Sequence, residues 1–253
     1  MNLQDIAKIL DEAAKNAQPV TQISSEHSFS ESDAYVIQQK SIERRYARGE
    51  KLIGLKMGFT SKAKMEQMGV HDLIWGRLTD DMLYKDGGQL PFQKFIHPRA
   101  EPEICFLIKK EINTAVPLSE IKNYVEGIAA AIEIIDSRYQ NFKFSLEDVI
   151  ADNCSSAGLV IGEWQSPDLP IDDLKIELII DGEAVQTGTS AAILGNPWES
   201  LVAAARLAVR YGETITAGSV IMAGAATSAV YLKKGQKVSA KVESLGEVSL
   251  EVV

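Results

Sequence analysis

Apolar positions in the first 60 residues repeat mainly with helical spacing. Over residues 3–17 they recur at intervals of three and four, which predicts an amphipathic helix that ends before Pro19. A second helix is predicted over residues 31–47, because Ser30 can cap its first turn. Its apolar stripe is expected to include Val36, Ile37 and Tyr46. The N-terminal part of the chain should therefore be largely helical.

Shorter elements follow, and strand-like patterns then take over. Residues 52–59 are punctuated by glycine and are predicted to form a strand, whereas residues 62–68 predict a short helix ending at Gly69. Beyond the turn signal at residues 86–88, apolar runs of strand length dominate. The predicted strands cover residues 100–108, 128–135, 159–161, 174–180, 220–223, 238–242 and 248–252.

Two further features define the fold class. Asp181-Gly182 separates two strand-like runs and predicts a β-hairpin. Residues 197–211 predict a helix, because Pro197 suits a first turn and Gly212 suits an end. Helices do not alternate regularly with strands, so a doubly wound parallel sheet is not expected. We expect an α+β protein, with a small helical N-terminal domain at residues 1–84 and a β-rich catalytic domain at residues 85–253.

Composition narrows the class of protein. The chain has 253 residues, of which 45% are hydrophobic and 24% charged, as in ordinary globular proteins. A net charge of −9 gives no general attraction for phosphate backbones, so nucleic-acid binding is not expected. The GxGxxG, GxxxxGK[ST] and GxSxG motifs are absent, which removes the usual support for nucleotide binding and for a serine hydrolase.

The cysteines and the N-terminus favour a cytoplasmic protein. Cys105 and Cys154 cannot form a disulfide framework, and no CxxC motif occurs. The N-terminus carries an acid where a signal peptide has its basic region. The charge-free region at residues 217–232 is broken by glycine and serine, so no membrane-spanning helix is expected.

Three glutamates stand in unexpected places. Glu101 and Glu103 are two apart in a predicted strand, so they project from the same face, and Pro102 between them suits an edge or bulge. Glu133 is a single acid within an apolar run that reads as a buried strand. A buried carboxylate needs a partner or a metal. The alternatives are a solvated strand end for the pair and a distant salt bridge for Glu133.

A cluster of three carboxylates would require a cation. Ligands that are all oxygen suit Mg²⁺ or Mn²⁺, and three protein ligands leave about three octahedral positions for water or a chelating substrate. Zinc sites favour cysteine and histidine, and the three histidines of this chain, His27, His71 and His97, are scattered. We therefore expect Mg²⁺ or Mn²⁺ in preference to zinc.

Two glycine-containing segments could complete such a site. Lys56 lies between Gly54 and Gly58, where a ligand can approach closely, and a lysine among apolar residues can anchor an anion. The alternative is a surface lysine with only its stem buried. Residues 224–228 follow a predicted strand, and their small and hydroxyl side chains suit either a ligand carboxylate or a plain turn.

Taken together, these segments resemble the fumarylacetoacetate hydrolase superfamily, and more closely its hydratase and decarboxylase branch from meta-cleavage degradation of aromatic compounds. The E-x-E at residues 101–103, followed by a third acid 30 residues on, is typical of the superfamily. IDSRYQNFKF, followed by ADN-x-SS, favours the decarboxylases over the hydratases. The similar segments are residues 54–70, 97–106, 133–156, 191–201 and 217–227, so the resemblance covers nearly the whole chain.

The resemblance implies a site and a fold. The fold would be a mixed β-roll or sandwich of the superfamily's C-terminal type, preceded by the helical part. The implied residues are Glu101, Glu103 and Glu133 for Mg²⁺ or Mn²⁺, Lys56 with Asp80 or Asp81 for catalysis, and Ser156 and Thr227 for the substrate. Relatives usually carry alanine at the position of Cys154, and we expect little effect from this difference.

The resemblance also implies partners and an activity. Members usually form homo-oligomers, and the decarboxylases associate with a sister hydratase. The activity would be loss of CO₂ from 2-oxo-3-hexenedioate, a 2-oxo dicarboxylate, to give 2-hydroxypenta-2,4-dienoate. The hydrolases of the superfamily use a His-Glu pair on a lid, and the surroundings of Glu26 and His27 do not match that motif. Hydrolysis of carbon–carbon bonds is therefore not expected.

The expected chemistry can be argued from the substrate alone. A metal beside the ketone stabilises the charge that gathers on its oxygen when CO₂ leaves the far end. The departing carboxylate should lie in an apolar pocket, because a bound cation would hold the electrons needed for cleavage. The alternatives are a 2-oxopent-4-enoate hydratase, in which the metal would play the same role, and a non-catalytic partner subunit.

Overall fold

The computed structural model describes residues 1–61, 65 and 72–253, so the helix predicted at residues 62–68 lies almost entirely outside the described residues. Helices α1 (Leu3–Asn16) and α2 (Glu31–Ala47) confirm the two N-terminal predictions. At the start of α2, the Ser30 hydroxyl accepts a hydrogen bond from the Asp33 backbone N–H, and the Asp33 carboxylate accepts one from the Ser30 backbone N–H. This reciprocal cap satisfies two backbone donors and fixes where the helix begins.

Helix α2 packs against α1 and against the short helix α5 (Leu146–Ala151). The buried Asp11 of α1 forms ion pairs of 2.7 Å with Arg44 of α2 and with Arg48, which directly follows this helix. The prediction for the apolar stripe is wrong for Val36 and Tyr46, which are 39% and 37% exposed. The buried face of α2 comprises residues 34, 35, 37, 38, 41 and 42, which meet α1, α5 and Trp75 of β2.

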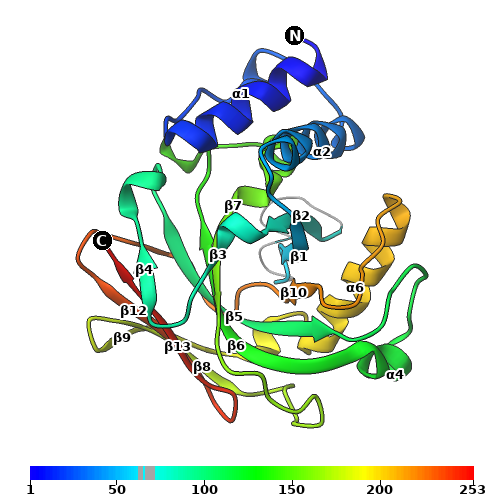
Figure 1. The fold of residues 1–253 in the computed structure, drawn as a ribbon, viewed down its shortest axis with the longest axis vertical. Helices are drawn as coiled ribbons and strands as arrows, with labels where there is room; N and C mark the ends of the chain where they lie inside the picture. Colours follow the sequence, from blue (N-terminus) through cyan, green and yellow to red (C-terminus); the bar gives the residue numbers. More distant parts are fainter. Residues whose placement is uncertain (62–64, 66–71) are drawn as a thin grey trace.

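Eight strands form one curled mixed sheet, in which β6 bends strongly (Figure 1). The strand order is β2-β1-β10-β5-β6-β7-β3, and β11 also pairs with β5. The strands are β1 (Leu52–Gly58), β2 (Ile74–Thr79), β3 (Leu83–Tyr84), β5 (Arg99–Ile108), β6 (Val125–Ile135), β7 (Ser156–Ile161), β10 (Val220–Met222) and β11 (Val230–Tyr231). This sheet contains the strands predicted at residues 52–59, 100–108, 128–135, 159–161 and 220–223.

A second sheet of five strands has the order β4-β13-β12-β8-β9. Its strands are β4 (Gly88–Leu90), β8 (Lys175–Ile180), β9 (Glu183–Thr189), β12 (Lys237–Val242) and β13 (Gly246–Val252). The predicted hairpin is confirmed, because Asp181 and Gly182 connect β8 to β9 with positive φ of 53° and 87°, as a two-residue hairpin turn requires. Strands β12 and β13 pack on β6, so the two sheets enclose a common apolar core.

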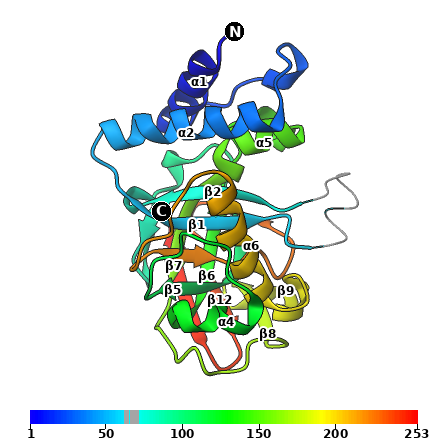
Figure 2. The same cartoon turned by 90° about the vertical axis from the view of Figure 1, so that its right-hand side faces the viewer.

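Helices cover the large sheet at one end and on one side. In Figure 2, α1, α2 and α5 form a layer above the strands, and α6 (Pro197–Arg210) crosses in front of the sheet, where it contacts β1. Pro197 occupies the first turn of α6, as predicted. The remaining helices are α4 (Leu118–Ile121) and the 3-10 helices η1 (Ile23–Ser25), η2 (Asp80–Met82), η3 (Phe92–Lys94), η4 (Lys122–Tyr124), η5 (Gln140–Phe142), η6 (Asn153–Ser155) and η7 (Ser190–Ala192).

The α+β class is confirmed, while the division at residue 84 stays a prediction. Across the described residues, no helix combines the length and the apolar character needed to cross a membrane.

Candidate metal and catalytic site

Three glutamates meet on one face of the large sheet. Glu101 and Glu103 lie on β5, and Glu133 lies on β6 directly opposite Glu101 in the antiparallel register. Side chains two apart on a strand, and side chains opposite each other on paired strands, share a face. One carboxylate oxygen of each glutamate lies within 4.8 Å of the other two. The pairing of β5 with β6 therefore turns an E-x-E and a distant glutamate into one acidic cluster.

The cluster is buried, and parts of it lack hydrogen-bond partners. Glu103 and Glu133 are 0% exposed, and Glu101 is 8% exposed. The backbone N–H of Gly224, just beyond β10, donates to Glu103 Oε2 at 2.8 Å. Glu103 Oε1 and Glu133 Oε1 have no hydrogen-bond partner among the described residues. Buried acceptors without partners are costly, so these two oxygens are available for a cation.

The electrostatics of the cluster also indicate that a cation is required. Burial raises the pKa of Glu103 well above its usual range, and the neighbouring Glu133 carboxylate raises it further. The pKa of Glu133 is also raised, first by burial, while Lys56 acts in the opposite direction. Two or more carboxyl groups that are buried together cannot all ionise unless a cation compensates their negative charges.

Lys56 supplies one such cation from β1. Its Nζ lies 2.9 Å from Glu133 Oε2 and donates a hydrogen bond of 3.2 Å to the Cys154 carbonyl oxygen. The side chain is buried, and burial alone would lower its pKa, but the carboxylates, first among them Glu133, leave the pKa raised. Lys56 is thus a charged ammonium group held inside the site. The alternative of a surface lysine is wrong.

The donor set fits a hard divalent cation. Three carboxylates converge, two of their oxygens lack partners, and one ammonium group cannot balance three negative charges. Oxygen-only ligands of this kind are those preferred by Mg²⁺ and Mn²⁺. The cluster of Glu101, Glu103 and Glu133 could therefore bind either ion.

A cavity of about 120 Å³ opens beside the cluster. Lys56 and Glu101 are its charged lining groups within the described part of the chain, and Thr60 and Ser155 contribute hydroxyl groups. Most of the remaining lining is apolar and comes from residues 57, 59, 74, 135, 142, 144, 149 and 225. The cavity thus has charged and hydroxyl groups for a polar part of a ligand and an apolar wall for the rest.

One wall of the cavity is a left-handed turn. Asn153, Cys154 and Ser155 all have positive φ, between 51° and 59°. Such a conformation is uncommon for residues with a side chain and is retained where the surroundings impose it. The turn is imposed partly by the Asn153 amide, whose oxygen accepts from the Arg77 N–H at 2.7 Å and whose nitrogen donates to the Arg77 carbonyl at 2.8 Å.

Close approach of this turn to β2 requires a glycine. A Cβ at position 76 would lie 2.6 Å from the Asn153 carbonyl oxygen, which backbone packing does not allow. Gly76 therefore lets the turn lie against the strand, where the Cys154 carbonyl can accept from Lys56. The Cys154 thiol donates to the Trp75 carbonyl at 3.0 Å, and burial raises its pKa to about 12.

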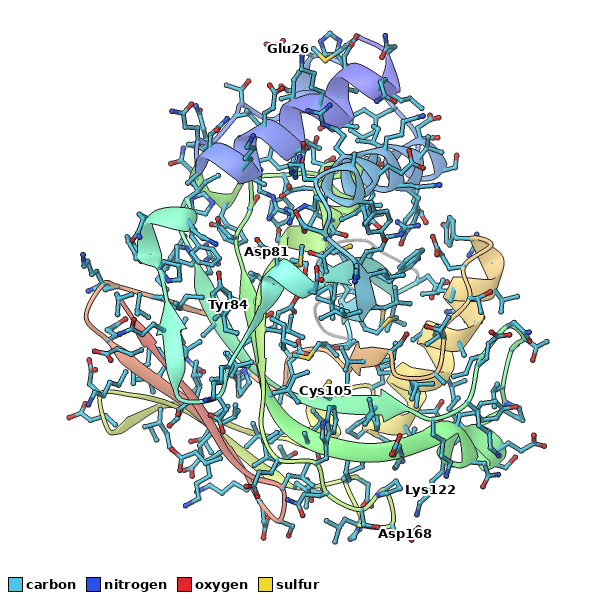
Figure 3. All side chains as sticks on the ribbon, in the orientation of Figure 1. Glu26, Asp81, Tyr84, Cys105, Lys122 and Asp168 are labelled. Atoms are coloured by element: carbon cyan, nitrogen blue, oxygen red, sulfur yellow. The ribbon has the colours of Figure 1, made fainter. Side chains whose placement is uncertain are left out.

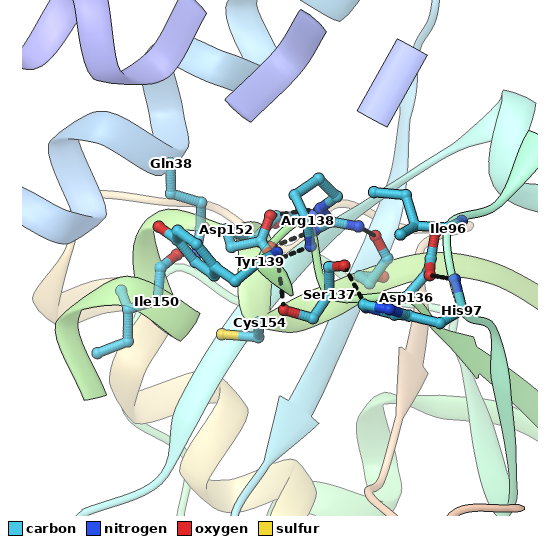
Figure 4. A network of polar contacts seen from close by, with 12 residues as sticks. Gln38, Ile96, His97, Asp136, Ser137, Arg138, Tyr139, Ile150, Asp152 and Cys154 are labelled. Carbon is cyan, nitrogen blue, oxygen red and sulfur yellow. Dashed lines mark hydrogen bonds and ion pairs between the residues drawn. The ribbon is translucent and has the colours of Figure 1, made fainter. Parts of the chain in front are cut away.

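A network of buried polar contacts joins this turn to the segment after β6 (Figure 4). Arg138 forms an ion pair with Asp152 and donates to the Asp152 and Ser156 carbonyl oxygens. Asp136 accepts hydrogen bonds from the backbone N–H groups of residues 96 and 97 at 2.7–2.8 Å. His97 Nε2 lies 2.7 Å from the Ser137 carbonyl oxygen. These contacts join residues 136–138 to the turn and to residues 96 and 97.

The two predicted substrate-binding residues lie outside the lining of the cavity. Ser156 is buried and its hydroxyl lies 3.9 Å from the Met82 sulfur, outside the cavity lining. The Thr227 hydroxyl donates to the Ser228 carbonyl oxygen at 3.3 Å, and Ala225 lines the cavity from that segment. Their substrate-binding roles stay predictions.

Asp80 and Asp81 lie on η2 rather than beside the glutamates. The Asp80 carboxylate accepts from the Lys51 backbone N–H at 2.9 Å. Asp81, labelled in Figure 3, lines a separate cavity of about 230 Å³ together with arginines 45, 48 and 138. Neither aspartate lines the cavity beside the cluster, and their catalytic roles stay predictions.

Several cavity residues were not predicted. Ser155 lines the cavity, whereas the prediction named its neighbour Ser156. The ADN-x-SS stretch identified the turn, but its left-handed backbone decides which serine faces inward. Phe142 and Phe144 also line the cavity, and IDSRYQNFKF marked their segment without showing their direction. His27 lies outside the cavity lining, His97 makes a structural contact, and His71 lies outside the described residues.

Comparison with known proteins identifies the family. The sequence model of the fumarylacetoacetate (FAA) hydrolase C-terminal family matches residues 74–253. The chain belongs to the fumarylacetoacetate hydrolase family, as the resemblance of its motifs predicted.

Particular relatives carry two related activities. A 4-oxalocrotonate decarboxylase of a Pseudomonas species is 51% identical over 98% of this chain and 97% of that protein. A 2-hydroxypent-2,4-dienoate hydratase of Pseudomonas putida is 35% identical over 77% of this chain and 90% of its own. The solved structure of 4-oxalocrotonate decarboxylase from Pseudomonas putida G7, complexed with magnesium and adipate, superposes with a TM-score of 0.95 at 35% identity, covering 99% and 97% of the two chains.

Proposed function

We propose that this protein is a Mg²⁺- or Mn²⁺-dependent carboxy-lyase that converts 2-oxo-3-hexenedioate (4-oxalocrotonate) to 2-hydroxypenta-2,4-dienoate and CO₂ in meta-cleavage degradation of aromatic compounds. The observation that carries the proposal is a buried cluster of three glutamates beside Lys56, opening on a cavity whose other walls are largely apolar. The 51% identity to a 4-oxalocrotonate decarboxylase supports it.

The residues of the site have separable tasks. Glu101, Glu103 and Glu133 would hold the metal ion, which when bound attracts negative charge onto the ketone oxygen and the adjacent carboxylate. Lys56 carries N–H donors that can bind the same ketone oxygen, and its proximity to Glu133 keeps it protonated. The Cys154 carbonyl oxygen, which accepts from Lys56, fixes the direction of the ammonium group.

The reaction balances with one proton taken up from water. The bond between the distal carboxylate carbon and its neighbour breaks, and its electron pair moves through the C=C bond to the ketone oxygen. The distal carboxyl group leaves as CO₂. The oxygen of the resulting dienolate takes one proton, which the Lys56 ammonium group in the cavity lining can donate, and Lys56 then recovers a proton from water.

The cavity favours decarboxylation over hydration. A hydratase must hold a water molecule over the diene with a group that transfers a proton. Within the described residues, the charged lining groups are Lys56 and Glu101, the hydroxyl groups are those of Thr60 and Ser155, and most of the remaining lining is apolar and offers no partner for such a water. The alternatives remain a 2-oxopent-4-enoate hydratase, supported by 35% identity to a hydratase, and a non-catalytic subunit, against which the buried acidic cluster argues.

The proposal includes the roles and partners inferred from the sequence. Asp80 or Asp81 would assist catalysis, and Ser156 and Thr227 would support the substrate pocket. Residues 85–253 would form the catalytic domain and residues 1–84 a separate N-terminal domain. The protein would be a cytoplasmic homo-oligomer that binds a sister hydratase, because the dienol product is unstable and benefits from immediate transfer.

Product analysis tests the activity. The purified chain is incubated with 2-oxo-3-hexenedioate and Mg²⁺, and CO₂ release is measured. A parallel assay follows loss of the dienoate chromophore without CO₂. We expect release of CO₂ that EDTA abolishes and Mn²⁺ restores. Rapid hydration of the dienoate with no CO₂ from the enedioate would show that the hydratase alternative is correct.

A further inference from the structure

The lining of the cavity contains an aromatic side chain that is held from several directions. Phe142 lines the cavity from η5, with a positive φ of 57°. The guanidinium carbon of Arg99 lies 3.8 Å from the centre of its ring, the ring centre of His97 lies at 4.9 Å, and that of Phe144 lies at 5.9 Å. A left-handed conformation at a bulky residue is retained only where its neighbours enforce it.

The cation that holds Phe142 is itself held in place. Arg99 lies on β5 two residues before Glu101, so both side chains leave the same face of the strand. Its guanidinium carbon lies 4.0 Å from the centre of the Tyr231 ring on β11, and Arg99 donates a hydrogen bond to the Tyr231 hydroxyl. The cation is thus stacked on two rings, an arrangement that is attractive when it is partly shielded from water.

The apolar part of the lining is where we expect the distal carboxylate of the substrate. If the keto-acid end of the substrate binds at the glutamate cluster and Lys56, the other end meets the lining formed by Phe142, Phe144 and Val149. A carboxylate loses its charge as it becomes CO₂. An apolar wall that excludes water disfavours the charged ground state more than the transition state, and so accelerates its loss.

We infer that Phe142 is a catalytic residue that desolvates the departing carboxylate, and that Arg99 is a positioning residue that acts by holding Phe142. The inference rests on the proposed decarboxylase function and deepens it. It also gives a physical reason why IDSRYQNFKF distinguishes a decarboxylase, because that segment supplies both Phe142 and Phe144.

The test compares side chains that differ in polarity at position 142. Phe142→Leu keeps the wall apolar, and Phe142→Ser replaces it with a small polar group. We expect the leucine variant to retain a kcat within threefold of the wild type and the serine variant to lose at least tenfold. The Kd for adipate, an inert dicarboxylate, should stay equal or become lower in the serine variant, because the wall disfavours a bound carboxylate. A role limited to packing would weaken adipate binding and kcat together, or leave both variants equally active, and either result overturns the inference.

Arg99 is tested in the same assays. The guanidinium Nε of Arg99 is buried with no hydrogen-bond partner among the described residues, so a direct contact with the distal carboxylate is the competing explanation. Arg99→Met should lower kcat between threefold and tenfold without weakening adipate binding, and Arg99→Lys should restore most of the loss. A loss of adipate affinity greater than tenfold in Arg99→Met would show that Arg99 binds the carboxylate itself.

Two controls separate the possible failures. Lys110 lies 5.9 Å from the centre of the Tyr124 ring, outside the cavity lining, so Lys110→Met removes a cation from an aromatic ring without altering the cavity. This variant should match the wild type. Calorimetric titration with Mn²⁺ should give the same affinity for every variant, which shows that the metal site is intact. If the wild type releases no CO₂, the proposed function fails; if it does, and the serine and leucine variants are equal, only the inference fails.

Discussion

The ion pair between Lys56 and Glu133 can show how burial changes the contribution of an ion pair to stability, because a second pair with the same separation lies at the surface. Lys56 Nζ and Glu133 Oε2 are 2.9 Å apart, with side chains 5% and 0% exposed. Lys122 Nζ and Asp168 Oδ1 are also 2.9 Å apart, with side chains 46% and 85% exposed (Figure 3). Lys56→Met and Lys122→Met remove the same charge and keep an apolar stem.

The two changes should have very different effects on stability. Breaking a buried ion pair leaves an uncompensated charge and costs about 3–5 kcal/mol, whereas an exposed pair contributes about 0–1 kcal/mol. In a chain of this size, 1 kcal/mol shifts Tm by about 2–4 °C. In EDTA we therefore expect Lys56→Met to lower Tm by about 6–20 °C, and Lys122→Met to lower it by no more than about 4 °C.

Metal should reduce the difference. A divalent cation bound by the glutamates compensates Glu133, so saturating Mn²⁺ should raise the Tm of Lys56→Met more than that of the wild type. The variant should still lose about 100-fold or more in turnover, the usual consequence of removing one donor to a developing oxyanion. Differential scanning calorimetry with EDTA and with Mn²⁺ measures the first effect. Equal Tm values for Lys56→Met and Lys122→Met in EDTA would show that the buried pair does not have the assigned electrostatic role.

Three other changes test separate parts of the site. Glu103→Gln keeps the shape of the side chain and removes one ligand charge, so calorimetric titration should show a large loss of Mn²⁺ affinity; unchanged affinity would remove Glu103 from the metal site. Gly76→Ala should destabilise the protein and lower activity, because the new Cβ would lie 2.6 Å from the Asn153 carbonyl oxygen, and denaturant unfolding with wild-type stability would contradict this packing. Burial raises the pKa of Asp152 to about 6 from its ordinary 3.8, although Arg138 acts to lower it. The folded state therefore binds this proton more tightly than the unfolded state, and stability is lost as the pH rises through about 6. Relative to Asp152→Asn, the wild type should lose about 2 kcal/mol of unfolding free energy between pH 4 and 6.5, and a difference that is independent of pH would refute the assignment.

Local elements of this protein are determined by sequence alone, because their causes are local. Ser30 and Asp33 cap α2 within four residues of chain, and the Asp181-Gly182 turn adopts the positive φ that a two-residue hairpin requires. The common face of Glu101 and Glu103 follows from strand geometry. The charge of Glu133 within an apolar run showed that a buried cation was needed, although not which one.

Contacts between distant segments were decided only by the tertiary structure. Glu133 reaches Glu101 because β5 and β6 pair in a register that no local signal specifies, and Lys56 joins them because β10 places β1 in the same sheet. The exposed positions of Val36 and Tyr46 depend on which side of α2 meets its neighbours.

The choice between adjacent serines has the same origin. The alternation of side chains along a strand cannot show which of Ser155 and Ser156 faces the cavity, because the left-handed turn at residues 153–155 interrupts that alternation. That turn is imposed by the hydrogen bonds between the Asn153 amide and the backbone of Arg77 on β2, and by the space that Gly76 leaves. Both residues of β2 are far from the turn in sequence. The sequence determined which groups the site needs, and long-range packing determined which of them face one another. The strained backbone of the turn is an example, because it persists only where contacts from a distant segment hold it.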